Sequence, residues 1–188
     1  DIHTPMVAYH SHSGSARLEA VIERLRQGQD VARVSDAGTP GISDPGGELV
    51  RAAIEAGAAV VPVPGPSAVA AAVCASGLDP SRFIFEGFLP RSKGEARVVL
   101  RRLASLPHTL VFYEAPNRVA ATLGVIEEEL PGRSGVVARE ITKRFEEFAR
   151  GAVSELRDRY AGEGPRGECV ILVSGATEAV VESVDLEG

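Results

Sequence analysis

The chain has 188 residues, of which 44% are hydrophobic and 24% charged, a balance typical of a globular protein with a sizeable core. Its formal net charge of −6 argues against a surface that is basic throughout and binds nucleic acid by bulk attraction. The sequence contains neither an apolar run long enough to cross a bilayer nor a basic stretch leading into an apolar segment, so we expect a cytoplasmic protein.

Metal and disulfide chemistry receive little support from the sequence. His10 and His12 lie two residues apart, but no third ligand of suitable type follows nearby. Cys74 and Cys169 lie in apolar surroundings without a C-x-x-C partner. We therefore expect two buried free thiols and no metal site.

The first elements in the chain alternate between helical and β-prone patterns. Apolar residues at helical spacing predict a helix over 16–26, and the apolar run 31–34 predicts a strand. A second helix is predicted over 49–56, and 58–63 has the continuous apolar character of a central parallel strand. This order of elements is typical of an α/β fold.

The segment 34–47, V-S-D-A-G-T-P-G-I-S-D-P-G-G, fills the predicted turn from strand to helix, where such folds bind ligands. Its glycines allow close approach of the backbone, and Asp36 and Asp44 supply acceptors. No lysine precedes Lys93, so a phosphate cradle is a poor fit and a ligand with hydroxyls, an amine or a positive centre is a better one. The same residues are also explained by a tight turn followed by a helix cap.

A similar turn, P-V-P-G-P-S-A, precedes an alanine-rich helix predicted over 68–75. The small side chains either leave room for a flat ligand or simply let the helix pack closely. Gly77 and Pro80 then flank Leu78 and Asp79 in a segment typical of a hinge. We place a domain boundary there, with one α/β lobe over 1–78 and a second over 79–175.

The second lobe repeats the alternation. Strands are predicted over 83–88, 108–113, 136–141, 145–150 and 167–175, and helices around 97–102 and over 119–130 and 153–160. The stretch 82–118 holds seven basic residues against three acidic ones, which fits either a nucleic-acid surface or a solvated helix face. Residues 176–188 are acidic and lack periodicity, as expected for a linker or tail.

Five motifs follow one another in a specific order: S-D-A-G-T-P-G-I-S-D-P-G, P-G-P-S-A, E-G-F-L-P-R-S-K-G, F-Y-E-A-P-N-R and A-R-E-I-T-K. Together they closely resemble the ribosomal RNA small subunit methyltransferase I family of the tetrapyrrole methylase superfamily, over roughly 4–174. The resemblance implies a bilobal tetrapyrrole-methylase-like fold with a cofactor cleft between two α/β domains. It also implies S-adenosylmethionine as cofactor, 2′-O-methylation of a cytidine ribose in small-subunit (16S) ribosomal RNA or the assembled subunit, and a homodimer.

The resemblance also assigns cofactor contacts to particular residues. The ribose and methionine part of the cofactor would be held by residues of the segment 34–47. The P-V-P-G-P-S-A turn would line the same site, and residues of the second lobe would also approach the cofactor. These predicted cofactor residues are Asp36, Ala37, Gly38, Thr39, Ser67, Ala68, Glu114, Cys169 and Val170, the last two through their backbones.

Catalysis and RNA binding are assigned to the second lobe. The sulfonium methyl is already electrophilic, so the reaction needs in-line placement and a group that takes up or stabilises the departing proton. We predict Glu140 and Lys143 as catalytic residues, with Glu114 and Arg139 as alternatives for the base and for the stabilising cation. The predicted RNA-binding residues are Arg91, Lys93, Arg118, Arg139 and Arg144.

The sequence departs from the family at both ends. The first strand with its P-T-P-I-G-N-L loop, the D-T-R segment and a C-terminal segment of the family have no counterpart, so we expect an N- and C-terminally truncated chain. Two other functions stay open: a small-molecule methyltransferase acting on a tetrapyrrole, and a non-catalytic cofactor-binding fragment.

Overall fold

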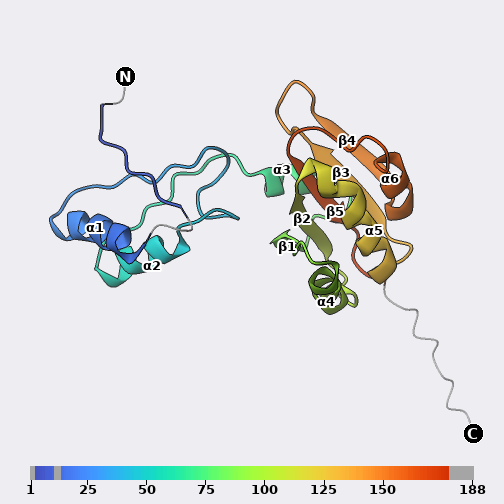
Figure 1. Cartoon of the computed structure of the whole chain (residues 1–188), viewed down its shortest axis with the longest axis horizontal. Helices are drawn as coiled ribbons and strands as arrows, with labels where there is room; N and C mark the ends of the chain where they lie inside the picture. Colours follow the sequence, from blue (N-terminus) through green and yellow to red (C-terminus); the bar gives the residue numbers. More distant parts are fainter. Residues whose placement is uncertain (1–2, 11–13, 178–188) are drawn as a thin grey trace, which may run out of the picture. The chain divides into compact units, whose positions relative to one another are not determined.

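The structure is a computed structural model that describes residues 3–10 and 14–177. The chain forms two compact units that divide between Ser67 and Ala68 (Figure 1). Most of the predicted acidic tail lies outside the described residues.

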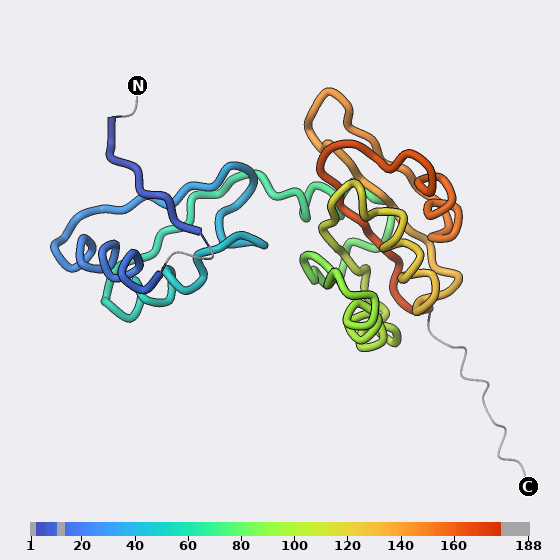
Figure 2. Tube along the Cα trace, viewed as in Figure 1, coloured from blue at the N-terminus to red at the C-terminus, as the bar shows by residue number. Residues whose placement is uncertain are grey.

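The first unit contains two helices, α1 (Ser15–Arg26) and α2 (Gly47–Glu55), whose apolar faces meet. Ile22 of α1 packs with Leu49 and Ala53 of α2, as the helical spacing predicts. The long segments around these helices run as irregular chain (Figure 2). Each helix begins and ends close to its predicted limits.

The strands predicted over 31–34 and 58–63 are wrong for this structure: neither segment is assigned as a strand. Val34 and Val63 expose most of their surface, although 58–63 is predicted as a central strand covered on both faces. A strand needs a neighbour to which it can hydrogen-bond, and Pro62 and Pro64 have no N–H to donate. The β-prone composition of these runs therefore does not decide their conformation.

The second unit is an α/β structure with a mixed five-stranded sheet of order β1-β2-β5-β3-β4, which confirms the predicted class. β1 and β2 are parallel, whereas β5 pairs antiparallel with β2 and β3, and β4 pairs antiparallel with β3. Its strands are β1 (Phe83–Phe88), β2 (Thr109–Glu114), β3 (Ser134–Arg139), β4 (Glu147–Ala152) and β5 (Cys169–Val173). Its helices are α3 (Ala68–Ser76), α4 (Lys93–Leu103), the short 3₁₀ helix η1 (Pro116–Arg118), α5 (Val119–Glu129) and α6 (Val153–Arg159).

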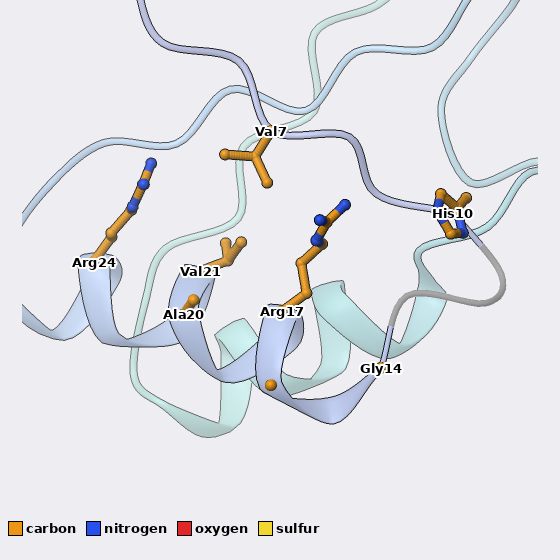
Figure 3. Close-up of a pocket in the computed structure, with 8 residues that line it drawn as sticks. Val7, His10, Gly14, Arg17, Ala20, Val21 and Arg24 are labelled. Atoms are coloured by element: carbon orange, nitrogen blue, oxygen red, sulfur yellow. The ribbon is translucent and has the colours of Figure 1, made fainter.

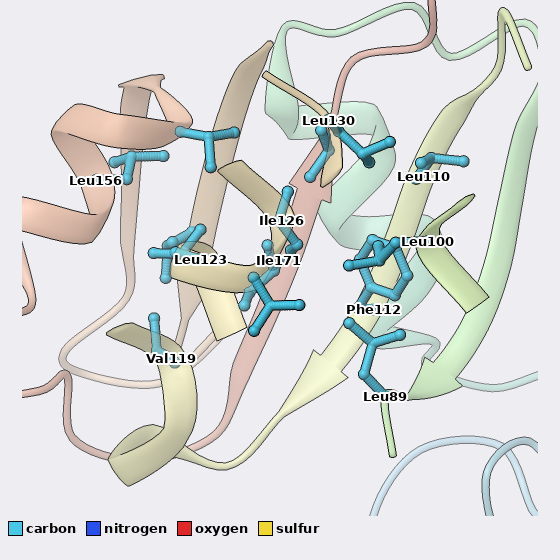
Figure 4. Close-up of a cluster of buried hydrophobic side chains, with 14 of the residues drawn as sticks. Leu89, Leu100, Leu110, Phe112, Val119, Leu123, Ile126, Leu130, Leu156 and Ile171 are labelled. Atoms are coloured by element: carbon cyan, nitrogen blue, oxygen red, sulfur yellow. The ribbon is translucent and has the colours of Figure 1, made fainter. Parts of the chain in front are cut away.

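Alternation along the central strands divides the core between the two faces of the sheet. Phe112 and Ile171 point toward α4, α5 and α6, and Figure 4 shows their side chains among Leu100, Leu123 and Leu156. On the opposite face lie, among others, Val111, Val136 and Leu172, which pack on Val69 and Val73 of α3. Because β5 is covered on both faces, all five of its residues are buried, as its continuous apolar sequence predicts.

Helix α3 packs on the sheet of the second unit, so the division at Ser67 precedes this helix, whereas the sequence places the boundary after it. Arg150 of β4 also binds the last turn of α3. Its Nε and Nη2 donate to the carbonyl oxygens of Ser76 and Ala75 at 2.8 and 2.6 Å. These bonds satisfy acceptors that a helix end leaves unpaired.

Candidate functional site

In the first unit, the structure brings together the two turns that the sequence singled out. The hydroxyl of Thr39 donates a 3.0 Å hydrogen bond to the carbonyl oxygen of Pro66. Within the segment 34–47, which we call the acidic loop, the hydroxyl of Ser35 lies 3.2 Å from the carbonyl oxygen of Ala37. The segment 35–39 is thereby folded back on itself and held against the P-G-P-S turn.

The carboxylate at the centre of this loop faces solvent. Asp36, Ala37 and Gly38 are exposed, and among the described residues Asp36 forms none of the ion pairs. Thr39, Ser67 and Ala68 are half-buried. The loop thus offers an exposed acceptor beside backbone groups that a ligand could reach.

Arg33 shapes the rest of this loop and is a residue that the sequence analysis missed. Its Nη2 lies 3.4 Å from the Asp44 carboxylate and donates to the carbonyl oxygen of Pro45. Gly46 has φ 125°, and a Cβ at that position would collide with the Arg33 guanidinium. The Arg33 side chain therefore packs against the backbone of 44–46 and holds this part of the loop in place. Asp44, which the sequence predicts as an acceptor for a ligand, is the ion-pair partner of Arg33.

A hollow of about 510 Å³ lies elsewhere in this unit, along α1. Figure 3 shows Arg17 and Arg24 on one side of the helix and Val7 on the N-terminal segment facing it. None of the predicted site residues lines this hollow. The candidate site of the first unit is therefore the acidic loop rather than this hollow.

In the second unit, the buried carboxylate of Glu114 has hydrogen-bond partners within the protein on both of its oxygens. One oxygen accepts hydrogen bonds from the amide of Ala115 at 2.8 Å, and the other from the hydroxyl of Thr122 at 2.6 Å. Arg118 adds an ion pair at 3.5 Å. The Glu114 side chain has no exposed surface, so in this arrangement it joins β2 to α5 rather than facing a ligand.

The predicted catalytic residues Glu140 and Lys143 lie together in the connection between β3 and β4. Lys143 Nζ is 3.0 Å from Glu140 Oε1 and 2.9 Å from Glu168 Oε2. Glu140 Oε1 also accepts a 3.0 Å hydrogen bond from the amide of Glu168. Gly167, with φ 85°, allows this approach, since a Cβ there would overlap the Glu140 carboxylate.

These contacts shift the pKa values of Glu140 and Lys143 in opposite directions. The amide of Glu168, with help from Lys143, lowers the pKa of Glu140, which makes its carboxylate a weak base. The carboxylates of Glu168 and Glu140 raise the pKa of Lys143, so it remains an ammonium ion. The pair is better suited to stabilising developing negative charge than to removing a proton.

Cys169 and Val170 begin β5, the central strand of the sheet. Cys169 lies opposite Glu114 on one side and Arg139 on the other. Both residues are buried, in agreement with one of the two thiol predictions, whereas Cys74 is exposed on α3 because its side of the helix turns away from the sheet. Burial raises the pKa of the Cys169 thiol to about 11.

Some of the predicted RNA-binding side chains are exposed to solvent, whereas others are bound to groups of the protein itself. Arg91 and Lys93 are exposed, and so is Arg144, which lies over the Phe145 ring. Arg118 binds the carbonyl oxygens of Leu89 and Pro90, and Arg139 is paired with Glu147 at 2.5 Å. Arg97 and Arg101 of α4 are paired with acidic residues of α5, so the positive stretch 82–118 is partly neutralised.

Membrane-spanning helices and metal-binding clusters are absent from the described residues. No helix there is long and apolar enough to cross a membrane. No group of three or more His, Cys, Asp or Glu side chains within 3–10 and 14–177 is arranged to hold a metal ion.

Residues 2–157 match the family of tetrapyrrole (corrin/porphyrin) methylases. The chain belongs to this family. In agreement, the methyltransferase CobJ has a similar fold, with a TM-score of 0.62 at 23% identity over 85% of this chain and 70% of that one. A uroporphyrin-III C-methyltransferase from Thermus thermophilus, solved with S-adenyl homocysteine, gives 0.57 at 19% identity over 84% and 72%.

Curated proteins named ribosomal RNA small subunit methyltransferase I are more similar in sequence. That of Pseudomonas aeruginosa is 47% identical over 93% of this chain and 63% of its own length. Those of Mesorhizobium japonicum and Bacillus subtilis are 45% and 42% identical, over 96% and 97% of this chain and 62% of each relative. The chain thus spans a little over three fifths of these relatives.

Proposed function

We propose that the chain acts in S-adenosylmethionine-dependent 2′-O-methylation of a cytidine ribose in small-subunit ribosomal RNA. The observation that carries this proposal is the 42–47% identity to curated proteins named ribosomal RNA small subunit methyltransferase I, over more than nine tenths of the chain. The two solved structures, the methyltransferase CobJ and the uroporphyrin-III C-methyltransferase, are less similar in sequence, at 23% and 19% identity.

The acidic loop of the first unit suits this cofactor. S-adenosylmethionine carries ribose hydroxyls and an ammonium group, which need acceptors, and a sulfonium centre, which favours nearby negative charge. The exposed Asp36 carboxylate meets these needs, and the hydrogen bond from Thr39 to Pro66 holds the loop in place. Gly38, with φ 70°, keeps its backbone open to a ligand.

When bound, this cofactor supplies an electrophilic methyl group. Within the second unit, we assign to Lys143 the role of donating a hydrogen bond to the ribose oxygen as the hydroxyl proton leaves that oxygen. The raised pKa of Lys143 keeps its ammonium group charged for this role. Glu140 and Glu168 position the ammonium group from two sides. Glu140 is then a positioning residue, and the final proton acceptor is solvent.

The proposal includes the partners of the reaction. Arg91, Lys93 and Arg144 keep exposed guanidinium or ammonium groups that could contact phosphates, whereas Arg118 and Arg139 are engaged within the unit. Phosphate contacts position an RNA and make its binding salt-dependent. A homodimer and a cytoplasmic location, where ribosomal RNA is modified, belong to the same proposal.

A transfer assay tests this function. The chain is incubated with reconstituted small subunits and cofactor carrying a tritiated methyl group, and any methylated nucleotide is mapped. We expect label on one cytidine ribose, and a loss of at least tenfold in rate for Lys143→Met with unchanged cofactor affinity. Label on an added tetrapyrrole instead of RNA would favour the small-molecule activity, and cofactor binding without transfer would favour a non-catalytic fragment.

A further inference from the structure

The connection between β3 and β4, residues 140–146, places an aromatic ring in solvent. Phe145 is 63% exposed and belongs to neither buried cluster of the second unit. The guanidinium carbon of Arg144 lies 5.5 Å from the centre of its ring. Burying a phenylalanine side chain stabilises a fold, so folding alone does not favour this exposed position.

Backbone and side-chain bonds fix the loop that carries this ring. The amide of Thr142 donates to the Glu146 carboxylate at 2.6 Å, and the amide of Lys143 donates to the carbonyl oxygen of Glu140 at 2.9 Å. Glu140 and Thr142 have φ of 49° and 67°, a left-handed conformation that non-glycine residues rarely adopt. Such strain persists only where the surroundings enforce it, and it is frequent at ligand sites.

The charges around the ring indicate the class of ligand. Lys143 is neutralised by Glu140 and Glu168, whereas Arg144 takes part in no ion pair among residues 3–10 and 14–177. An exposed ring beside an unpaired guanidinium matches a nucleotide, because the base can stack on the ring while the phosphate meets the cation. The loop also adjoins the sheet end where Arg139, Cys169 and Glu114 lie in register.

We propose that Phe145 is a stacking platform for an unpaired base of the RNA, with Arg144 contacting the adjoining phosphate. The inference rests on the proposed function and adds to it a requirement for single-stranded RNA at this loop. In duplex RNA the bases are stacked on each other, so the ring would have no base to receive.

The sequence contains no tryptophan, which gives a direct test. Phe145→Trp in the full chain introduces one fluorophore at the proposed platform. Phe83→Trp is the matched control, because Phe83 is also exposed but lies at the opposite end of the sheet, paired with Thr109. The probes are a fluorescently labelled single-stranded oligoribonucleotide with the sequence around the nucleotide that the transfer assay maps, and the same strand annealed to its complement.

Anisotropy of the label reports binding, and tryptophan emission reports stacking. We expect the single strand to bind and to quench Phe145→Trp but not Phe83→Trp, with little quenching by the duplex. Phe145→Ala should weaken binding of the single strand about fivefold or more without changing its salt dependence, whereas Arg144→Ala should reduce the salt slope by about one.

The possible failures are distinguishable. Binding without quenching of Phe145→Trp, or equal quenching by the duplex, would overturn the stacking platform and leave the proposed function intact. Absence of binding by every variant and by the unmodified chain would overturn both. If Phe145→Ala changed the oligomeric state in gel filtration while RNA affinity stayed the same, the ring would belong to an interface between copies and the inference would be wrong.

Discussion

Thr39 and Pro66 are joined by a 3.0 Å hydrogen bond, although they are 27 positions apart in the sequence. The bond links the acidic loop to the proline-rich turn, so two segments that the sequence marked separately form one surface of the first unit. The proposed cofactor contacts of 36–39 and Ser67 depend on this link.

Removing the Thr39 hydroxyl tests the link. Thr39→Val keeps the shape of the side chain but removes the donor, and we expect affinity for S-adenosylmethionine to fall about three- to tenfold, the worth of one such hydrogen bond. Isothermal titration calorimetry measures the change. The control is Thr4→Val, at an exposed position in the same unit. An unchanged affinity for Thr39→Val would show that the loop does not need this tether.

Glu114 provides a test of stability. In Glu114→Ala the hydroxyl of Thr122 and the guanidinium of Arg118 lose their shared partner, and we expect the free energy of unfolding in urea to fall by about 2–3 kcal/mol. Glu86→Ala, at an exposed position on β1, should change it by less than about 0.5 kcal/mol. If Glu114→Ala left stability unchanged and abolished cofactor binding, the role predicted from the sequence would replace the structural one.

The Lys143 cluster predicts a pH dependence with a definite sign. Because its pKa is raised above 10.5, Lys143 adds stability that is complete below pH 10.5 and is lost as pH rises through the folded value. Glu140, with a pKa below 4.5, adds stability above that pH, which is lost as pH falls through its folded value.

Nuclear magnetic resonance titration of labelled lysines measures the first effect, since the chain has only Lys93 and Lys143. Glu168→Gln removes the largest cause and should bring the pKa of Lys143 back toward 10.5, with the Lys93 signal as internal reference. A Lys143 signal that does not respond to this substitution would contradict the ion pairs described here.

The two cysteines should differ in reactivity. With a pKa of about 11, Cys169 is a thiolate in only about one molecule per thousand at pH 8, and it is buried, whereas Cys74 is exposed. A thiol reagent at pH 8 should therefore label one cysteine quickly in the folded chain and two in urea. Fast labelling of folded Cys74→Ser would show that β5 opens more readily than its burial indicates.

The second unit was largely predictable because its sequence patterns agree with its packing. All five strands and the helices α5 and α6 lie within about two residues of their predicted limits, and α4 includes the predicted 97–102, since Phe112, Ile171 and their neighbours have a sheet and helices to bury them. The strands predicted over 136–141 and 145–150 are displaced by two residues, to 134–139 and 147–152, so 140–146 form their connection. The runs 31–34 and 58–63 are equally β-prone, but they have no ladder partner among the described residues. A local pattern can specify a strand only when a neighbour completes it.

The candidate site was predictable to a lesser extent. Sequence motifs pointed to Asp36, Thr39 and the pair Glu140 and Lys143 as candidates. They did not point to the residues whose contacts determine the position and the pKa of these groups. Arg33 and Glu168 lie in runs predicted as strands, but nothing in those runs indicated their ion pairs, because ion pairs between distant residues leave no spacing signal. Glu114 had such a signal, yet its burial and its bond to Thr122 became visible only in three dimensions.

The central claim is that the loop 35–39 binds S-adenosylmethionine. Its most direct measurement is a calorimetric titration of the chain, of Asp36→Asn and of the control Asp30→Asn, an exposed aspartate of the same unit. We expect saturable binding to the unmodified chain and to Asp30→Asn, with at least tenfold weaker binding to Asp36→Asn. Equal affinity in all three proteins, or no binding in any, would contradict it.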